Sequence, residues 1–398
     1  MTALAPDLDT RHLSPTAILL NIGHAMDHWM MVVFAYTWGV IAGVWGTEWT
    51  ELTPYNYGAL VMFGGGSIVS GRLGDLWGRW VMMVIFFAGM GASALVIALC
   101  TNAWQIGAAL TLMGAFASIY HPVGIPMLVQ KARKAGIVIG VNGLAGNMGI
   151  AIAAGVSVFI AERFGWQMAF ILPGAICLLC AVAFVLLVPR ETEAPARRAN
   201  KLLDMPRAMM ARVFAIMTLT AITGSVIFNF TTSGNGELLR AHVAEAAADP
   251  ALLATMLFAI FAAASLAQIV VGKLIDAYPL KTVFLGVAAL QVPLFLIAAQ
   301  VEGWALFVVA IGFMLLVFGA VPFTDAMIVR YVDDRMRSRV TGMRLAIGYG
   351  VSSAAVALLG PSVKLAGFPT MLTLLAGLAC VTFLAVMFLP ADPPPPKE

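Results

Sequence analysis

Three side chains in the first apolar stretch of the sequence could do chemistry together. His24, Asp27 and His28 are spaced i, i+3 and i+4, so in a helix they share one face. Imidazole exchanges protons near neutral pH. An aspartate beside a protonated imidazole stays ionised, whereas desolvation opposes its charge. We expect this cluster to carry a proton. The alternatives are a hydrogen-bonded structural cluster and a transition-metal site, but one helix face rarely completes a metal shell, so no residue is assigned to a metal.

Other polar residues fall inside apolar stretches, where ionisable groups are expensive and indicate function. His121 precedes Pro122, and a proline permits a bend in a membrane helix. Asp325 and Arg344 cannot stay unpaired in hydrocarbon. Either they pair with each other, or Arg344 faces an anionic substrate and Asp325 exchanges a proton. The residues that we expect to line a substrate cavity are His121, Asn147, Asn229, Arg344 and Tyr349.

The composition shows which environment surrounds the helices that carry these residues. Of 398 residues, 61% are hydrophobic and only 11% are charged, with a mean hydropathy of +0.93. Soluble domains carry about 25% charged residues, and disordered chains are poor in apolar residues, so both classes are excluded. A membrane helix needs about 20 apolar residues. The sequence therefore predicts an all-α polytopic membrane protein with twelve transmembrane helices.

The twelve predicted spans form two groups of six. An N-terminal six-helix bundle is expected over 1–189, a basic cytoplasmic linker over 190–212, a C-terminal six-helix bundle over 213–390 and a proline-rich cytoplasmic tail over 391–398. The predicted spans are 15–45, 55–74, 80–101, 103–130, 136–161, 166–189, 208–233, 251–274, 280–300, 302–331, 339–364 and 368–389.

Basic residues are distributed very unevenly between the two sides of these spans. If the N-terminus is cytoplasmic, nineteen of the 23 Lys and Arg residues lie on the cytoplasmic side. The opposite side holds only Arg163, Arg240 and Lys364. Cytoplasmic loops carry such an excess, so we expect both termini in the cytoplasm and the protein in a plasma membrane, the inner membrane of a bacterium. The net charge of +3 gives no indication of nucleic acid as a partner.

The two halves of the sequence repeat one loop motif. Gly71-Arg-Leu-Gly-Asp75 recurs 201 residues later as Gly272-Lys-Leu-Ile-Asp276. The longer run Gly71-Arg-Leu-Gly-Asp-Leu-Trp-Gly-Arg79 resembles the loop between the second and third helices of the major facilitator superfamily, G-x-L-(G/A)-D-(R/K)-x-G-R-(R/K). It departs at Leu76 and Trp80, where that family usually has basic residues.

This resemblance implies two pseudo-symmetric six-helix bundles that bind substrate near the membrane midplane and expose it alternately to each side. It also implies that the repeated loop is a latch that closes one face. A carboxylate such as Asp75 can sit against a helix N-terminus and a nearby arginine, and glycines allow helix ends to approach. The latch residues are Gly71, Arg72, Asp75, Arg79, Gly272, Lys273 and Asp276.

A narrower resemblance points to export. His24-x-x-Asp27, Tyr120-His121-Pro122 and Gly146-Asn147-x-Gly149 resemble the fosmidomycin-resistance group of bacterial drug exporters. The glycine-rich segment partly resembles the antiporter motif of the superfamily, although its Gly-Pro pair is absent because Asn147 follows Gly146.

Taken together, these features predict a proton-coupled antiporter that exports a small polar or anionic compound. A proton-coupled importer of an organic acid or nutrient is the first alternative. A metal or metal-chelate carrier using His24, Asp27 and His28 is the second. The sequence lacks a Gly-x4-Gly-Lys-Ser/Thr phosphate-binding loop and any nucleophile–base arrangement, so we expect no enzyme and no cofactor other than a proton gradient. Its expected partners are a small-molecule substrate, protons and membrane lipids, and we expect a monomer.

The charge distribution makes one direct prediction. A reporter fused after residue 198, in the basic linker, is expected to be active only if it is a cytoplasmic reporter. A periplasmic reporter at the same position serves as the control and is expected to be silent. Activity of the periplasmic fusion would reverse the assigned orientation.

Overall fold

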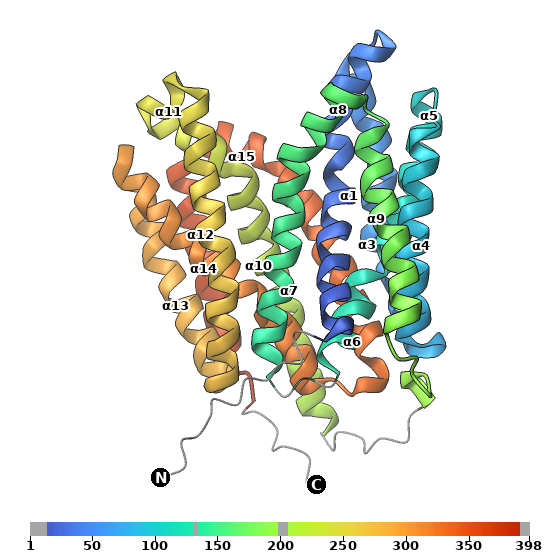
Figure 1. Cartoon of the computed structure of the whole chain (residues 1–398). Helices are drawn as coiled ribbons and strands as arrows, with labels where there is room; N and C mark the ends of the chain where they lie inside the picture. The colour runs from blue at the N-terminus through green and yellow to red at the C-terminus, as the bar shows by residue number, and fades with distance from the viewer. Residues whose placement is uncertain (1–13, 131, 133, 198–205, 391–398) are drawn as a thin grey trace, which may run out of the picture. The chain divides into compact units, whose positions relative to one another are not determined.

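The computed structural model describes residues 14–130, 132, 134–197 and 206–390. Throughout these residues the chain forms helices joined by turns and short loops (Figure 1). The expected tail 391–398 and the linker residues 198–205 lie outside the described residues. The all-α polytopic fold class predicted from composition is confirmed.

The first half of the chain builds six helical crossings, three of them from more than one piece. The elements are α1 (Pro15–Trp45), α2 (Trp49–Leu52), η2 (Thr53–Asn56), α3 (Tyr57–Trp77), α4 (Arg79–Ala98), α5 (Ala103–Ala117), η3 (Tyr120–Gly124), α6 (Ile125–Val129), α7 (Ala135–Ile152), η4 (Ala153–Ser157), α8 (Val158–Phe164) and α9 (Met168–Leu187).

The second half is built from longer helices. The elements are η5 (Pro195–Arg197), α10 (Arg207–His242), α11 (Ala244–Ala248), α12 (Pro250–Ala277), α13 (Leu280–Ala298), α14 (Gly303–Tyr331), η6 (Asp334–Met336) and α15 (Arg337–Met387). α15 contains two predicted spans, which meet at Gly367, where φ is 75°. This backbone conformation favours glycine, so the helix bends there.

Ten helical segments of the described chain are long and apolar enough to cross a membrane. α3 and the first part of α15 complete the twelve predicted spans, and both carry charged residues, among them Arg72, Asp75 and Arg344. The largest difference from the predicted bounds is at the end of α10. This helix continues to His242 although it contains Gly234 and Gly236, because no proline interrupts the segment and Leu238 and Leu239 are buried against their neighbours.

Local signals set the limits of α1, the helix that carries the His/Asp cluster. The hydroxyl of Ser14 accepts a hydrogen bond from the backbone N–H of Ala17 at 3.2 Å, which caps the first turn. Pro15 occupies the first helical position, where its missing N–H costs nothing. The helix ends at Gly46 with φ 66°, the left-handed conformation that glycine adopts most readily.

Proline has a visible consequence between α5 and α6. Pro122 has no N–H to continue the helical ladder, and the chain from Tyr120 to Gly124 forms a π-helical turn. Such turns insert an extra residue and frequently occur at functional sites. His121 lies within this turn.

Contacts divide the chain into two compact units that do not follow chain order throughout. The first contains Met1–Val138, Ala145–Lys201 and Asp333–Leu345; the second contains Ile139–Leu144, Leu202–Val332 and Ala346–Glu398. The start of α15 therefore belongs to the first unit and the middle of α7 to the second. Neither exchange follows from the hydropathy of the sequence.

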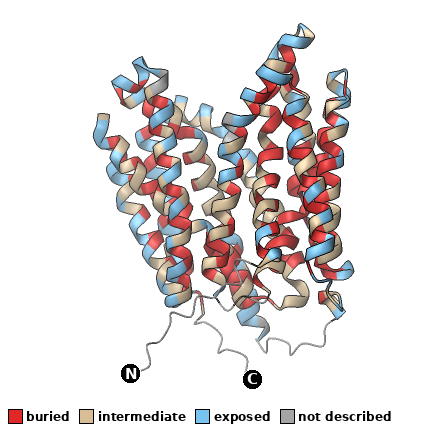
Figure 2. Ribbon diagram, viewed as in Figure 1, coloured by how far each residue is buried: buried red, intermediate tan, exposed pale blue. Residues whose placement is uncertain are grey.

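Each unit packs its own aromatic interior. Phe86, Phe87 and Phe184 are fully buried in the first unit, and Phe284 stacks on Phe323 in the second with ring centroids 4.2 Å apart. Exposed residues nevertheless occur along many of the helices (Figure 2). Many of them are large and apolar, including Leu186 with 75% of its surface free. These apolar faces can contact lipid, because the backbone N–H and C=O groups beneath them are already hydrogen-bonded within the helix.

Candidate functional site

Three histidines from two helical elements converge in the first unit. His24 and His28 lie one turn apart on α1, and their Nε2 atoms are 3.1 Å apart. His121, from the π-helical turn, brings its Nε2 to 3.3 Å from that of His28. Ligand atoms of all three rings lie within 4.8 Å of one another. The sequence placed the first two on one face; the tertiary structure adds the third.

Asp27 adjoins this cluster and is completely buried. Its Oδ2 lies 3.6 Å from Nε2 of His121, and neither carboxylate oxygen has a hydrogen-bond partner among the described residues. A buried carboxylate without hydrogen bonds is costly. The site therefore favours a proton on this carboxylate or a positive charge beside it, on an imidazole or a bound cation.

Tyr120 holds the His24 ring in place. The two rings are stacked, with centroids 4.8 Å apart and planes 17° apart. The Tyr120 hydroxyl donates a hydrogen bond to the backbone oxygen of Leu20 at 2.6 Å, which ties the π-helical turn to α1. On the opposite side is Gly146, where a Cβ would lie only 2.7 Å from Nε2 of His24. Glycine leaves the space that this ring occupies.

Two further contacts fix α1 against the helices around it. The indole N–H of Trp29 donates to the hydroxyl of Ser157 at 2.8 Å, and both groups are buried. At Gly149 an added Cβ would overlap the backbone oxygen of Ala25. Such close approach of helices requires a small residue. The glycine-rich segment of α7 thus serves packing beside the cluster.

Arg344 belongs to the same unit, because the start of α15 packs there. It is half-buried, and its guanidinium lies close enough to His121 to interact electrostatically with it. Asn147, on α7, is half-buried in this unit as well.

The remaining residues predicted to bind substrate or exchange a proton lie in the second unit. Asp325 is buried on α14, and Tyr349 is half-buried on α15. The side-chain amide of Asn229 donates to the hydroxyl of Ser352 at 2.7 Å and to the backbone oxygen of Ser225 at 2.8 Å, which links α10 to α15. Since Asp325 and Arg344 fall in different units, their pairing stays a prediction.

The carboxylate of Asp75 lies at a helix N-terminus. It accepts hydrogen bonds from the backbone N–H groups of Ser338 at 3.3 Å and Arg339 at 3.0 Å. These are groups in the first turn of α15 that have no partner within the helix, and the helix dipole favours a negative charge there. At Gly71 a Cβ would overlap the backbone oxygen of Ser338, so glycine permits this approach.

Arg79, the last residue of the motif, is fully buried and bonded to three residues from later in the chain. It donates to the carboxylate of Asp334 at 2.9 Å, to the backbone oxygen of Asp334 at 2.8 Å and to the Ser338 hydroxyl at 3.2 Å. A fourth bond, to the backbone oxygen of Pro126, measures 3.3 Å. The planar guanidinium fork suits such multiple donation.

The rest of the predicted latch is less constrained. Arg72 and Lys273 are exposed, Gly272 is buried, and Asp276 is half-buried. The partners Asp334 and Ser338 were missed by sequence reasoning, as was Tyr120 as a site residue. Asp334 lies in a run of charged residues, Asp333-Asp-Arg-Met-Arg337, and this run was the available signal.

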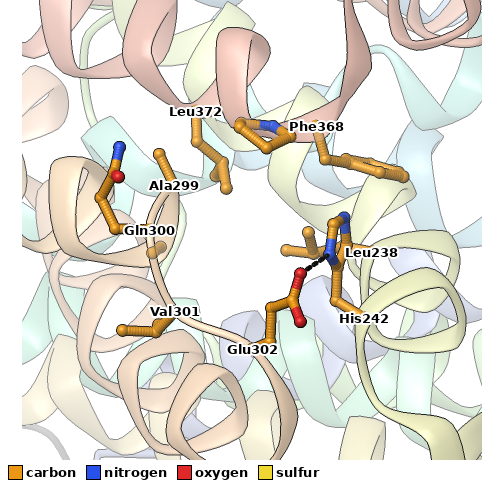
Figure 3. A pocket seen from close by; sticks show the side chains of 10 residues that line it. Leu238, His242, Ala299, Gln300, Val301, Glu302, Phe368 and Leu372 are labelled. Carbon is orange, nitrogen blue, oxygen red and sulfur yellow. Dashed lines mark ion pairs between the residues drawn. The ribbon is translucent and has the colours of Figure 1, made fainter.

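A surface pocket lies within the second unit. Its empty space is about 270 Å³. His242 and Glu302 lie side by side in its wall, with 3.8 Å between Nδ1 and Oε1 (Figure 3). None of the site residues predicted from the sequence lines this pocket.

The fold and the buried polar groups in membrane-spanning helices define the class of protein as a polytopic α-helical carrier. Residues 17–236 match the family model described as Major Facilitator Superfamily. The chain belongs to this family, which consists of transporters and not enzymes.

The relatives found by sequence have low sequence identity to this chain. A probable actinorhodin transporter of Streptomyces coelicolor is 29% identical over 136 residues, covering 33% of this chain and 23% of the relative. The multidrug resistance protein MdtG of Yersinia enterocolitica is 24% identical over 245 residues, covering 58% and 57%. The chain thus matches less than two thirds of the length of either relative.

Solved structures share the fold along almost the whole chain. The proton:xylose symporter XylE, bound to 6-bromo-6-deoxy-D-glucose, gives a TM-score of 0.77 at 12% identity and covers 95% of this chain and 96% of its own. The human organic anion transporter MFSD10 gives 0.72 at 15% identity, covering 94% and 99%. The Escherichia coli fucose:proton symporter FucP gives 0.69 at 13% identity, covering 94% and 99%.

The Asp75 contact makes a measurable prediction. Asp75→Ala removes both acceptors from the first turn of α15 and leaves buried N–H groups unpaired, at a cost of about 1–3 kcal/mol for each. A cysteine introduced at position 338, which is buried in the wild type, should then react with a maleimide at least roughly fivefold faster. The background lacks the four native cysteines.

Arg72→Ala is the matched control, because Arg72 lies on the same helix and is exposed. It should leave the labelling rate unchanged. Equal rates in wild type and Asp75→Ala would show that Asp75 does not hold this segment closed.

Proposed function

We propose that the protein is a proton-coupled secondary transporter and that its cycle is an antiport that exports a small polar or anionic compound. The observation that carries the proposal is Asp27. Its carboxylate is fully buried on a membrane-spanning helix and has no hydrogen-bond partner among the described residues. Such a group is energetically unfavourable inside a membrane, and membrane proteins have such groups mainly along ion and proton pathways.

The cluster around Asp27 has the parts that a proton carrier needs. Nε2 of His121 lies 3.6 Å from the carboxylate, and Nε2 of His28 lies 3.3 Å from that nitrogen. A proton can therefore pass between the carboxylate and the imidazoles by small side-chain movements. Its presence changes the charge of a water-poor site, and a change of charge is what couples a gradient to a conformational equilibrium.

The anionic substrate class rests on Arg344. A guanidinium cannot be deprotonated in a protein and binds carboxylates or phosphates from two sides. Its electrostatic interaction with His121 supports communication between substrate and proton sites. We propose that Asn147, Asn229, Tyr349 and His121 contribute polar contacts to the substrate and that Asp325 exchanges a proton in the second unit.

The direction of transport is proposed from the relatives. One of them is named a multidrug resistance protein, which favours export. Two structural neighbours are proton symporters, which keeps a proton-coupled importer as the second candidate. The protein is proposed to act in the inner membrane of a bacterium with both termini in the cytoplasm. Transport by vesicles of defined orientation, measured against a panel of organic anions and drugs, separates the two directions.

The proton role predicts the behaviour of Asp27→Asn. This change keeps the shape of the side chain but removes its ionisation, so transport against a substrate gradient should be lost while exchange down the gradient persists. The measurement uses vesicles with an imposed pH gradient and compares variants at equal membrane abundance. His242→Gln, a histidine change in the pocket of the second unit, should transport as wild type does. Active transport by Asp27→Asn would assign coupling to another residue, with Asp325 the first candidate.

The substrate role predicts the behaviour of Arg344→Lys. Lysine keeps the charge but loses the planar fork. Loss of a charged hydrogen bond costs about 1.5–3 kcal/mol, which corresponds to roughly 10- to 150-fold weaker substrate binding. Membrane abundance should not change. The contradicting outcome has two parts. Substrate affinity is unchanged in Arg344→Lys, and the double variant Arg344→Ala, Asp325→Ala restores the membrane abundance that either single change lowers. Arg344 is then a structural residue, and the anionic substrate class is rejected.

A further inference from the structure

We propose that His24, His28 and His121, with Asp27 as the fourth ligand, bind one divalent transition-metal ion. The same cluster carries the proton in the proposed function. Only the role of the ion in transport rests on that function. The binding site itself requires no assumption about coupling or direction.

The spacing of the nitrogens carries the proposal. Zinc lies 2.0–2.1 Å from histidine nitrogens in tetrahedral sites, which puts neighbouring ligand atoms roughly 3.3 Å from each other. The Nε2 atoms of His24 and His28 are 3.1 Å apart and those of His28 and His121 are 3.3 Å apart. Two of the three pairs thus have the separation of ligands on one small cation, and ligand atoms of all three rings lie within 4.8 Å of one another.

The carboxylate of Asp27 is the second and independent observation. Both of its oxygens are buried and without a hydrogen-bond partner, and Oδ2 lies 3.6 Å from Nε2 of His121. The three histidines alone form the compact ligand group, and this carboxylate, beside His121, is the nearest candidate to add one oxygen to their three nitrogens. One negative charge also offsets part of the charge of a divalent ion in a low-dielectric environment.

The elements that hold the ligands form a scaffold for such a site. Histidines at i and i+4 on a helix are the spacing that chelates zinc in several metalloproteins. The π-helical turn supplies the third ligand from a different segment. One face of α1 could not complete a metal shell by itself, and this ligand adds what it lacked. Tyr120 stacks on His24 and fixes the plane of that ring.

The donor set indicates which ions fit. Imidazole nitrogens suit Zn²⁺, Co²⁺, Ni²⁺ and Cu²⁺, whereas Mg²⁺ and Ca²⁺ prefer sites made entirely of oxygen. Protons and a metal ion compete for the same imidazole nitrogens, because the ligating form is neutral. The ion would therefore be a second cation that alternates with the proton at this cluster.

Equilibrium metal binding by the purified full-length protein, without a polyhistidine tag, tests the proposal. The probes are Co²⁺, followed by its visible absorption, and Zn²⁺, which should displace it. We expect one equivalent bound, no competition by Mg²⁺ or Ca²⁺, and a zinc-edge X-ray absorption spectrum of the wild type with imidazole scattering at about 2.0–2.1 Å.

Ligand variants give the second arm. His28→Gln and His121→Gln should each weaken binding at least about 100-fold, the upper end of what loss of an outer-shell partner costs. His242→Gln is the matched control, because this histidine lies in the second unit, and it should bind as wild type does. Elution volume and thermal midpoint show whether each variant is folded.

Three outcomes would overturn the proposal: no binding by the wild type, a spectrum without imidazole ligands, or equal affinity in His28→Gln, His121→Gln and His242→Gln. Proton-driven transport in the presence of a strong zinc chelator separates this proposal from the proposed function. Persistent transport together with no metal binding rejects the metal site alone. Metal binding together with active transport by Asp27→Asn rejects the proton role alone.

Discussion

Burying charge away from water is the constraint on which this structure depends. Arg79 is fully buried, and the structure meets the cost with four hydrogen bonds, two of them to Asp334. Asp75 is also buried, and backbone N–H groups at the start of α15 donate hydrogen bonds to its carboxylate. Asp27 is the exception, because the imidazole of His121 lies 3.6 Å from it but no described group donates a hydrogen bond to it. This contrast with Asp75 and Arg79 is the reason that we propose Asp27 as the proton site.

Small residues allow these charges to meet their partners. Gly71 permits the contact with Ser338, Gly146 leaves room for the His24 ring, and Gly149 permits the approach to Ala25. Lipid provides no hydrophobic force between helices, so close packing and hydrogen bonds must hold them together. The same glycines that make packing possible therefore define where imidazoles and carboxylates can lie. Packing and function cannot be separated at these positions.

The π-helical turn at Tyr120–Gly124 joins the chemistry to the fold. Pro122 removes one ladder hydrogen bond, and the added residue in the turn changes the direction of the side chains around it. Tyr120 anchors the turn to α1 through the backbone oxygen of Leu20, while His121 joins the cluster. One backbone irregularity thus supplies both the third imidazole and the bond that holds it in place.

The sequence by itself determined the twelve spans, the repeat, the motif loop and the shared face of His24, Asp27 and His28, because hydropathy and helical periodicity are local properties of the chain. Only the tertiary structure brought His121 to that face, paired Arg79 with Asp334 and set Asp75 against Ser338 and Arg339. These partners lie 93 to 264 residues apart. The periodicity of the sequence cannot predict contacts between residues so far apart. These contacts depend on where glycines let helices approach each other and where prolines let them bend.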